Sequence, residues 1–215
     1  MKPMVVVLSS PSGGGKTTIA RRVLAGRDDI EYSVSATTRP PRTGEIDGRE
    51  YHFLSQEEFE RRVAADQFLE HARYNGNRYG TLESEVGRIN AGGKHVLLDI
   101  EIQGARLVRK RFSDALLIFV IPPSAAVLAD RLRGRGTETD EVIDGRLRRA
   151  VEEIGAAGEY DYVVVNDDLD VAVATVDAIL DCEALRPARD PGFGRRIEQL
   201  KQEVAAEVGR SATTN

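Results

Sequence analysis

Unbroken apolar runs, separated by segments of helical spacing, dominate the chain. Such runs are typical of parallel strands that are buried on both faces of a sheet. They predict core strands at about 4–10, 95–100, 115–121 and 161–166. Because helical spacing returns between these runs, the pattern predicts a three-layer α/β architecture on a parallel sheet.

Glycines and capping residues delimit the predicted helices. Gly26 ends the first helix, Gly92 ends a helix over 82–91, and Ser124 caps a later one. A helix from about residue 140 is expected to bury one stripe and to carry arginines on the opposite face. The stripe is Ile143, Leu147, Val151 and Ile154, and the arginines are Arg146, Arg148 and Arg149. The remaining predicted elements are a helix over 103–111, a last core helix over 171–185, a loop over 186–194 and a polar amphipathic helix over 195–208.

Residues 33–80 interrupt this alternation as a small β-rich insertion. The stretch 32–36 alternates as a half-buried strand does, and 51–54 predicts another short strand. Ser55 and Glu58 form a capping box for the helix that follows them. The pair Asn75-Gly76 between strand-forming residues predicts a hairpin.

A glycine-rich loop joins the first strand to the first helix. Gly13, Gly14 and Gly15 let the backbone turn its N–H groups inward, and the helix start adds its positive dipole end. Lys16 supplies a charge for the β- and γ-phosphates, and Thr17 supplies a hydroxyl for Mg²⁺. Ser10 stands where the pattern G-x-x-x-x-G-K-[ST] has its first glycine. The strand–loop–helix context favours a phosphate loop over the alternative, a merely glycine-rich turn.

Composition and charge narrow the choice of partners. The 215 residues are 41% hydrophobic and 30% charged, which is typical of a globular protein and predicts one core with insertions. The net charge of -5 argues against nucleic acid or an anionic membrane as the main partner. Cys182 is the only cysteine and cannot form an internal disulfide, and the apolar runs are shorter than a membrane span. We therefore expect a cytoplasmic protein.

Polar residues at the ends of the predicted strands indicate where a ligand binds. Ser10, Asp99 and Asn166 all follow apolar strands, and α/β sheets bind ligands at the carboxyl ends of their strands. Asp99 has the position of a Walker B carboxylate.

Two sets of arginines suit phosphate groups, because guanidinium pairs with phosphate oxygens in a bidentate way. The first set comprises Arg39 and Arg42 with Tyr51 and Tyr79, and the second comprises Arg131, Arg135 and Arg146. Solvated loops, a packed hairpin and a charged surface helix are the alternatives, and the phosphate loop shifts the balance toward ligand binding. No general base is conspicuous, and none is needed if the acceptor is itself a phosphate.

Several motifs occur in the order and spacing of the guanylate kinases. They are SxPSGGGKTT, SVSATTRPPRTGEIDGREYHF, GNRYGT, LLDIEIQG, RLRGRGTET and DYVVVND. From about Val5 to Leu185 the chain resembles a bacterial guanylate kinase. The resemblance implies a three-layer P-loop nucleoside-monophosphate kinase fold and the reversible transfer of the ATP γ-phosphoryl group to GMP or dGMP. It also implies a core over 1–33, 81–123 and 160–186, a GMP-binding insertion over 34–80 and a helical lid over 124–159. A C-terminal extension, partly helical, follows over 187–215.

The resemblance also implies roles for residues at matching positions. For ATP they are Ser12, Gly13, Gly14, Gly15, Lys16, Thr17, Thr18, Arg131 and Asn166, with Mg²⁺ on Thr17 and on Asp99, directly or through water. For GMP they are Ser35, Arg39, Arg42, Tyr51, Glu70, Tyr79, Thr81, Asp99 and Glu101. The residues implied in catalysis are Lys16, Arg39, Arg135 and Arg146. Guanine offers an acceptor at O6 and donors at N1 and N2, which Ser35 and Glu70 complement, whereas adenine has the opposite polarity along that edge.

Two residues depart from the family's pattern, and two other functions stay open. Ser10 and Glu101 stand where a glycine and an aspartate are expected, while Thr81 keeps the hydroxyl of a serine. One alternative is a non-enzymatic guanylate-kinase-like domain that binds phosphopeptides, although such domains lack a complete donor site. The other is a sugar-phosphate kinase, against which Ser35 and Glu70 argue. The sequence leaves open the oligomeric state, a homodimer included, and the role of the segment after Leu185.

Overall fold

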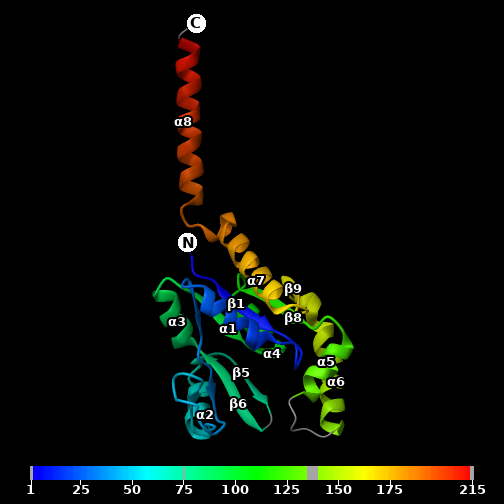
Figure 1. The fold of residues 1–215 in the computed structure, drawn as a ribbon. Helices are drawn as coiled ribbons and strands as arrows, with labels where there is room; N and C mark the ends of the chain where they lie inside the picture. Colours follow the sequence, from blue (N-terminus) through cyan, green and yellow to red (C-terminus); the bar gives the residue numbers. More distant parts are fainter. Residues whose placement is uncertain (1, 75, 135–139, 214–215) are drawn as a thin grey trace. The chain divides into compact units, whose positions relative to one another are not determined.

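The computed structural model describes residues 2–74, 76–134 and 140–213 (Figure 1). The chain divides into two compact units, of which one is Pro3–Val176 and the other is Met1–Lys2 with Asp177–Asn215. The strands are β1 Val5–Ser9, β2 Ile30–Tyr32, β3 Ala36–Thr37, β4 His52–Phe53, β5 Phe68–Tyr74, β6 Asn77–Leu82, β7 His95–Asp99, β8 Leu116–Ile121 and β9 Tyr162–Val165. The α-helices are α1 Lys16–Gly26, α2 Gln56–Ala64, α3 Glu83–Ala91, α4 Ile102–Arg111, α5 Ala125–Arg133, α6 Asp140–Gly155, α7 Leu169–Ala184 and α8 Phe193–Thr213. Two 3₁₀ turns, η1 Ala156–Glu159 and η2 Pro187–Arg189, complete the described elements.

A parallel sheet in the order β2-β7-β1-β8-β9 forms the core of the larger unit. Every neighbouring pair in it is parallel, as the unbroken apolar runs predict. Strand β1 lies in the centre, between β7 and β8, so the loop that follows it opens at the middle of the carboxyl edge of the sheet. The predicted α/β fold with a parallel sheet is confirmed.

Alternate residues of the central strands pack against helices on the two faces of the sheet. One face carries Val5, Val7 and Leu98, which pack with buried residues of α3 and α4. Helix α1 buries Ile19, Ala20 and Val23. This burial on both faces explains why the strands show no polar alternation.

A second, mixed sheet in the order β4-β3-β6-β5 comes from residues 36–82. The prediction of one strand over 32–36 is wrong, because β2 ends at Tyr32 in the first sheet and β3 begins at Ala36 in the second. Ser33 still donates its N–H to the Leu97 carbonyl of the first sheet at 3.0 Å, and the residues on both sides of the break have a strand-like pattern. Periodicity alone therefore does not reveal that the chain changes sheets.

The predicted hairpin is present, with Tyr74 paired to Asn77 and Gly76 at a φ of 79°. Residue 75 lies outside the described residues. The capping box is formed in one direction: Ser55 Oγ accepts from the Glu58 N–H at 3.0 Å. The Glu58 carboxylate instead binds Arg61 and Arg62, and these hydrogen bonds lower its pKa to about 2.

Helix α6 differs from its predicted amphipathic pattern. Ile143 and Ala150 are buried, whereas Val151 is 72% exposed and Ile154 is 41% exposed. The buried stripe turns toward Ala150 because a small residue lets α6 approach Leu128 and Leu132 of α5 closely. The expectation that Arg146 lies on the face opposite the stripe is wrong as well, because Arg146 is half-buried while Arg148 and Arg149 are exposed.

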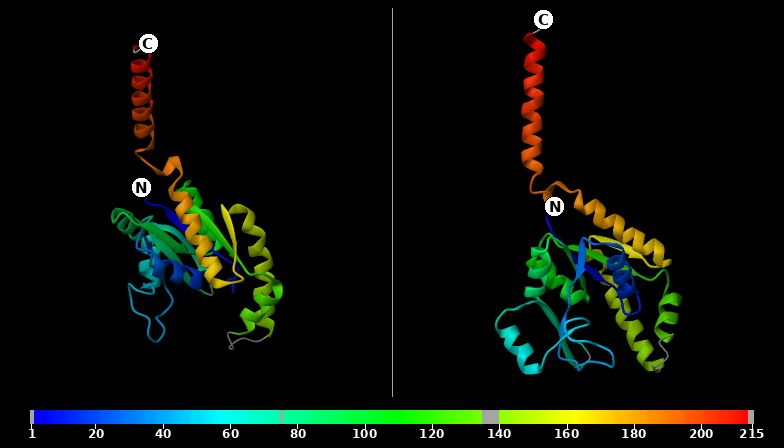
Figure 2. Two further views of the ribbon diagram at one scale, coloured as in Figure 1. Left: turned by 45° about the horizontal axis from the view of Figure 1, so that its top comes forward. Right: turned by 60° about the vertical axis from the view of Figure 1, so that its left-hand side comes forward.

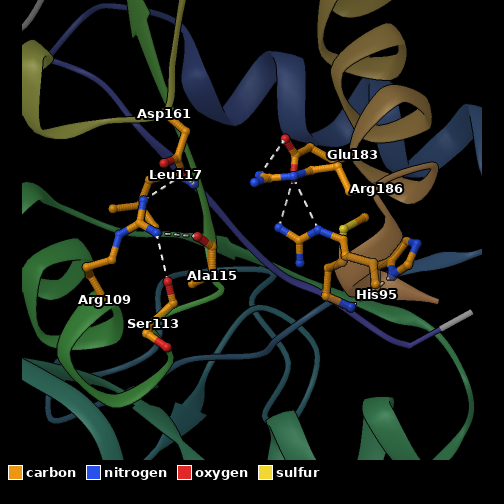
Figure 3. Close-up of polar contacts among 10 residues, drawn as sticks. His95, Arg109, Ser113, Ala115, Leu117, Asp161, Glu183 and Arg186 are labelled. Atoms are coloured by element: carbon orange, nitrogen blue, oxygen red, sulfur yellow. Dashed lines mark hydrogen bonds and ion pairs between the residues drawn. The ribbon is translucent and has the colours of Figure 1, made fainter. Parts of the chain in front are cut away.

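Strand β9 is an edge strand rather than the fully buried core strand that its apolar run predicts. Val164 is buried, but Val163 is 47% and Val165 is 50% exposed. A polar network fixes the start of this strand beside β8 (Figure 3). Asp161 Oδ2 accepts from the Leu117 N–H at 2.8 Å and from Arg109 Nη2 at 2.6 Å, and Arg109 also donates to the Ala115 carbonyl at 2.8 Å.

The smaller unit contains the C-terminal part of α7, then η2 and α8. The predicted loop over 186–194 is partly wrong, because η2 covers Pro187–Arg189 and α8 begins at Phe193. Glu183 is buried and accepts from Arg189 at 2.9 Å and from Arg186 at 3.2 Å (Figure 3). This buried ion pair holds η2 against the end of α7. Among the described residues, no helix is long and apolar enough to cross a membrane.

Candidate functional site

The loop between β1 and α1 has the backbone of an anion-binding nest. Gly13 and Gly15 have φ values of 87° and 96°, which side-chain-bearing residues rarely adopt. Gly15 is the N-cap of α1, and no side chain among the described residues caps the helix. The first N–H groups of α1 therefore remain available to a ligand.

Asn166, which follows β9, closes one side of this loop. Its Nδ2 donates to the Gly14 carbonyl at 2.9 Å, and a Cβ on Gly15 would lie 2.2 Å from the same nitrogen. Arg131 of α5 donates to the Asn166 carbonyl at 2.9 Å. The Nη1 of Arg131 is buried without a hydrogen-bond partner among the described residues. A cavity of about 320 Å³ opens here, lined by Gly13, Gly15, Thr18, Arg131, Asn166, Asp167 and Leu169.

Lys16, Thr17 and Asp99 form a charged cluster where β1 and β7 end. Lys16 Nζ lies 2.8 Å from Asp99 Oδ1, and Thr17 Oγ1 donates to Asp99 Oδ2 at 2.7 Å. Glu101 lies farther from Lys16, at 3.5 Å, and its side chain is half exposed. Burial by itself would lower the pKa of Lys16, but the charges of Asp99 and Glu101 outweigh it and raise that pKa. Lys16 is therefore a fixed positive charge at neutral pH.

A larger cavity of about 640 Å³ extends from this cluster to the second sheet. Most residues predicted to bind GMP line it, namely Ser35, Arg39, Arg42, Tyr51, Glu70, Tyr79, Asp99 and Glu101, together with Lys16 and Thr17. Thr81 is fully buried behind this lining. Residues that are far apart in the sequence thus meet in one cavity.

Glu70 is a buried carboxylate at the inner end of this cavity. It accepts from Thr81 Oγ1 at 2.8 Å across the β5–β6 pair. Burial raises the pKa of Glu70, and the hydrogen bonds from Thr81 offset part of the rise. A Cβ on Gly104 of α4 would lie 2.7 Å from Glu70 Oε2, so this glycine leaves the space that the carboxylate occupies.

Arg39 and two tyrosines also line this cavity. The guanidinium of Arg39 lies 5.3 Å from the ring centre of Tyr51, and the rings of Tyr51 and Tyr79 meet edge to face at 5.9 Å. Arg39 also makes a bidentate pair with Glu45, with both distances 2.9 Å. Glu45 therefore holds the guanidinium in one orientation toward the cavity.

A carboxylate of α6 reaches the phosphate loop. Glu153 Oε2 accepts from the Ser12 N–H at 3.1 Å. Burial raises the pKa of Glu153, and the hydrogen bond from Ser12 offsets part of the rise. Arg146, on the same helix, is half-buried, and the predicted catalytic residue Arg135 lies outside the described residues.

Comparisons with known proteins agree with this geometry. The family model described as guanylate kinase matches residues 2–183. This chain belongs to the guanylate kinase family. It is 50% identical over 189 residues to a guanylate kinase of Symbiobacterium thermophilum, covering 88% of this chain and 90% of that one. It is 43% identical over 201 residues to a guanylate kinase of Maricaulis maris, covering 93% and 92% of the two chains. The crystal structure of guanylate kinase from Anaplasma phagocytophilum superposes with a TM-score of 0.75 at 33% identity, covering 92% and 94% of the two chains.

The departure at Ser10 is accommodated within the guanylate kinase fold. Ser10 is buried, and its hydroxyl donates to the Pro11 carbonyl at 3.0 Å. The N–H of Gly14 also donates to Pro11, at 2.8 Å, so the entry turn closes on one carbonyl. A side chain on Gly14 would also be excluded, because its Cβ would lie 2.8 Å from the Cβ of Ser10.

Three residues of the site were not singled out by sequence reasoning. Glu45 and Gly104 lie within the family motifs GEIDG and LLDIEIQG, so the motifs contain them without indicating a role. Glu153 lies on a helix rich in charge, and no local pattern distinguishes it from Glu152. Only the tertiary contacts with Arg39, Glu70 and Ser12 identify these residues.

Proposed function

We propose that this chain, a member of the guanylate kinase family with that family's activity, transfers the γ-phosphoryl group of ATP to GMP or dGMP. The observation that carries the proposal is the single cavity that joins the phosphate-loop residues Lys16 and Thr17 to the buried carboxylate of Glu70. With a donor phosphate at one end and the guanine base at the other, the acceptor phosphate is proposed to lie between them, next to the phosphoryl group that is transferred. The reaction is reversible and yields ADP with GDP or dGDP.

The ATP phosphates are proposed to bind backbone N–H groups of the loop and the helix start, from Gly13, Gly15, Lys16 and Thr17. Lys16 then follows the β- and γ-phosphates, and Arg131 contributes the Nη1 that lacks a partner among the described residues. Asn166 borders the same cavity, where the nucleoside of ATP is proposed to bind. Lys16, Arg131 and the positive end of the helix dipole together supply positive charge around a phosphoryl group whose negative charge spreads during transfer.

The side chains of Thr17 and Asp99, at the proposed ATP site, are suitable ligands for Mg²⁺. The Thr17 hydroxyl and an Asp99 carboxylate oxygen lie 2.7 Å apart. The other oxygen, Asp99 Oδ1, is buried without a hydrogen-bond partner among the described residues, although Lys16 lies at ion-pair distance. Mg²⁺ is commonly held by a hydroxyl, one or two carboxylates and the nucleotide phosphates themselves. When bound, the ion neutralises charge on the β- and γ-phosphates.

The acceptor is proposed to lie with its phosphate on Arg39, Arg42, Tyr51 and Tyr79. Its guanine N1 and N2 donors then face Glu70, and Ser35 lies within the same cavity for O6. Because Thr81 already fills one side of Glu70 Oε1, the carboxylate is held in one orientation for the base. Adenine has an unprotonated N1 and a C–H at this edge, so AMP would give the buried carboxylate no hydrogen bond from its base, which disfavours AMP as a substrate.

No proton needs to be abstracted from the acceptor, because a nucleoside-monophosphate oxygen is already an anionic nucleophile at neutral pH. The protein therefore acts by positioning and by charge. Arg146 of α6 and Arg135 are proposed to complete the positive charge around the transferred group. The oligomeric state does not enter this mechanism, and we place the reaction in the cytoplasm, where no disulfide is required of Cys182.

An acceptor panel tests this function. Purified protein with Mg²⁺ and ATP is given GMP, dGMP, AMP, CMP or dTMP, and ADP release is followed in a coupled assay. We expect turnover with GMP and dGMP and on the order of 10⁴-fold lower kcat/KM with AMP, because the polar edge is mismatched. Equal turnover of AMP would contradict the assignment of the guanine site. Tight binding of a phosphopeptide without ADP release would instead favour a non-enzymatic phosphopeptide-binding domain. Turnover of a sugar phosphate would favour a sugar-phosphate kinase.

A further inference from the structure

Helix α8 carries an exposed apolar stripe that the kinase fold does not account for. The family model ends at residue 183, whereas α8 covers Phe193–Thr213. Its apolar residues recur at intervals of three or four along one face, and all are exposed. They are Phe193, Ile197, Leu200, Val204 and Val208. Both views of Figure 2 show α8 as one uninterrupted helix. A stripe of this spacing is typical of a helix that pairs with another helix.

We propose that α8 pairs in antiparallel orientation with α8 of a second copy of this chain. In this arrangement Phe193 packs on Val204 of the partner subunit, and Ile197 packs on Leu200 of the partner subunit. Each of these two contacts occurs twice, because a two-fold axis relates the two helices. The seam then consists of large apolar side chains from both helices, as it does in paired helices.

The charged residues on the flanks of the stripe favour antiparallel pairing with a second copy of α8. Helical spacing places Arg196 and Glu203 on one flank of the stripe and Lys201 on the other. In an antiparallel pair like flanks face each other, so Arg196 lies opposite Glu203 of the partner subunit, again twice. In a parallel pair Arg196 would face Lys201 of the partner subunit, which is repulsive. The charge pattern of α8 is therefore complementary to itself when one copy is reversed.

The contacts that α8 makes within its own chain are compatible with this pairing. Arg196 binds Asp190, just before the helix, and Glu203 accepts from Gln199 at 2.8 Å. Both are exposed interactions, which stabilise a helix weakly and can be shared with a partner. The opposed helix dipoles of an antiparallel pair add a small attraction. Because the seam is short, we expect a dimer that dissociates on dilution.

Sedimentation velocity over about a hundredfold range of protein concentration tests the pairing. The expected result is a shift from the 23.6 kDa chain to a species of twice that mass as concentration rises. Leu200→Glu is expected to weaken the dimer by at least about tenfold in Kd while preserving the helix, because glutamate is a good helix former. Gln202→Glu adds the same charge on the opposite face of α8 and is the matched control, expected to leave the dimer unchanged.

A charge exchange tests the orientation. Arg196→Glu and Glu203→Arg should each weaken the dimer, because each places like charges opposite one another. The double variant Arg196→Glu/Glu203→Arg should restore it, because the pair is reformed with its signs reversed. A parallel pair would not be restored in this way, so failure of the double variant overturns the antiparallel arrangement.

Two outcomes would overturn the pairing itself. One is a chain that stays at 23.6 kDa at all concentrations. The other is a monomer in which Leu200→Glu lowers the melting temperature and exposes α8 to protease, since that would assign the stripe to packing within the same chain. Phosphoryl transfer to GMP is expected to be equal in the wild-type protein and Leu200→Glu, so loss of the dimer is distinguishable from loss of the kinase site.

Discussion

A methyl group on Gly104 of α4 would lie 2.7 Å from Glu70 Oε2, so the absence of a side chain on one helix determines where the carboxylate of another element can sit. Glu70 comes from β5 and is held from its other side by Thr81 of β6. The guanine end of the proposed site is therefore shaped by both the mixed sheet and the helix that follows β7.

Gly104→Ala is expected to displace the Glu70 carboxylate and raise the KM for GMP by about tenfold, with the KM for ATP nearly unchanged. Gly87→Ala is the matched control, because Gly87 lies in α3 and its Cβ would meet no atom of the described part of the chain within 4 Å. That control should increase the free energy of unfolding by roughly 0.5–1 kcal/mol, since alanine favours the helix, and should leave both KM values unchanged. Steady-state kinetics with each nucleotide varied in turn checks both. An unchanged KM for GMP in Gly104→Ala would contradict the role of this glycine.

Glu70→Gln is expected to raise the KM for GMP by tenfold or more, on the order of 1.4 kcal/mol, because the amide offers guanine a donor where an acceptor is needed. In the wild-type protein, kcat/KM for GMP should fall as the pH drops through the raised pKa of Glu70, and so at a higher pH than for an ordinary glutamate. If kcat/KM for GMP fell at the same low pH in Glu70→Gln, the fall would be caused by protonation of a group other than Glu70.

The raised pKa of Glu70 also makes the free energy of unfolding depend on pH, in a direction that can be stated. A raised carboxyl pKa means that the folded state binds the proton more tightly than the unfolded state does. The stabilising contribution is present below the ordinary value of 4.5 and is lost as the pH rises through the raised pKa. Urea unfolding between about pH 5 and 8 should therefore show Glu70→Gln gaining stability relative to the wild-type protein as the pH rises.

Lys16→Ala is expected to lower kcat by on the order of 10³ while the chain still folds, because the phosphate-following charge is lost. Asp99, with a side chain only 7% exposed, would lose its cationic partner, so a modest drop in melting temperature should accompany the loss of activity. Lys94→Ala is the control, because Lys94 is 44% exposed and lies 3.8 Å from Glu31. Circular dichroism at the assay temperature separates the two effects. Near-normal kcat in Lys16→Ala would mean that the donor site lies elsewhere.

Glu153→Gln is expected to lower the KM for ATP by a few-fold, about 1 kcal/mol or less, because it removes a negative charge beside the loop that binds phosphates. The amide oxygen can still accept from the Ser12 N–H, so the contact between α6 and the loop is retained. Glu152→Gln, on an exposed neighbouring residue, is the control for the change in net charge. A rise in the KM for ATP in Glu153→Gln alone would show that the charge supports ATP binding rather than opposing it.

The phosphate loop and the parallel core could be predicted because both depend on local sequence. Val5–Ser9 is buried on both faces, and the loop that follows needs glycine wherever φ is positive, as at Gly13 and Gly15. The stripe of α6 could not be predicted in the same way. Val151 and Ala150 are both apolar neighbours, and only the approach of α5 decides which one is buried.

The sequence by itself determined which residues the family motifs assign to the proposed site. Motif order predicts Lys16, Asp99 and Glu70 as residues of the proposed site, because their chemistry and spacing follow the family pattern. The tertiary structure decided how these residues are held. Glu45 on Arg39, Gly104 beside Glu70 and Glu153 on Ser12 are contacts between elements far apart or in separate turns, with no periodicity to reveal them. Local patterns determine which residues form a strand, loop or helix, whereas the position of one side chain against another depends on how those elements pack.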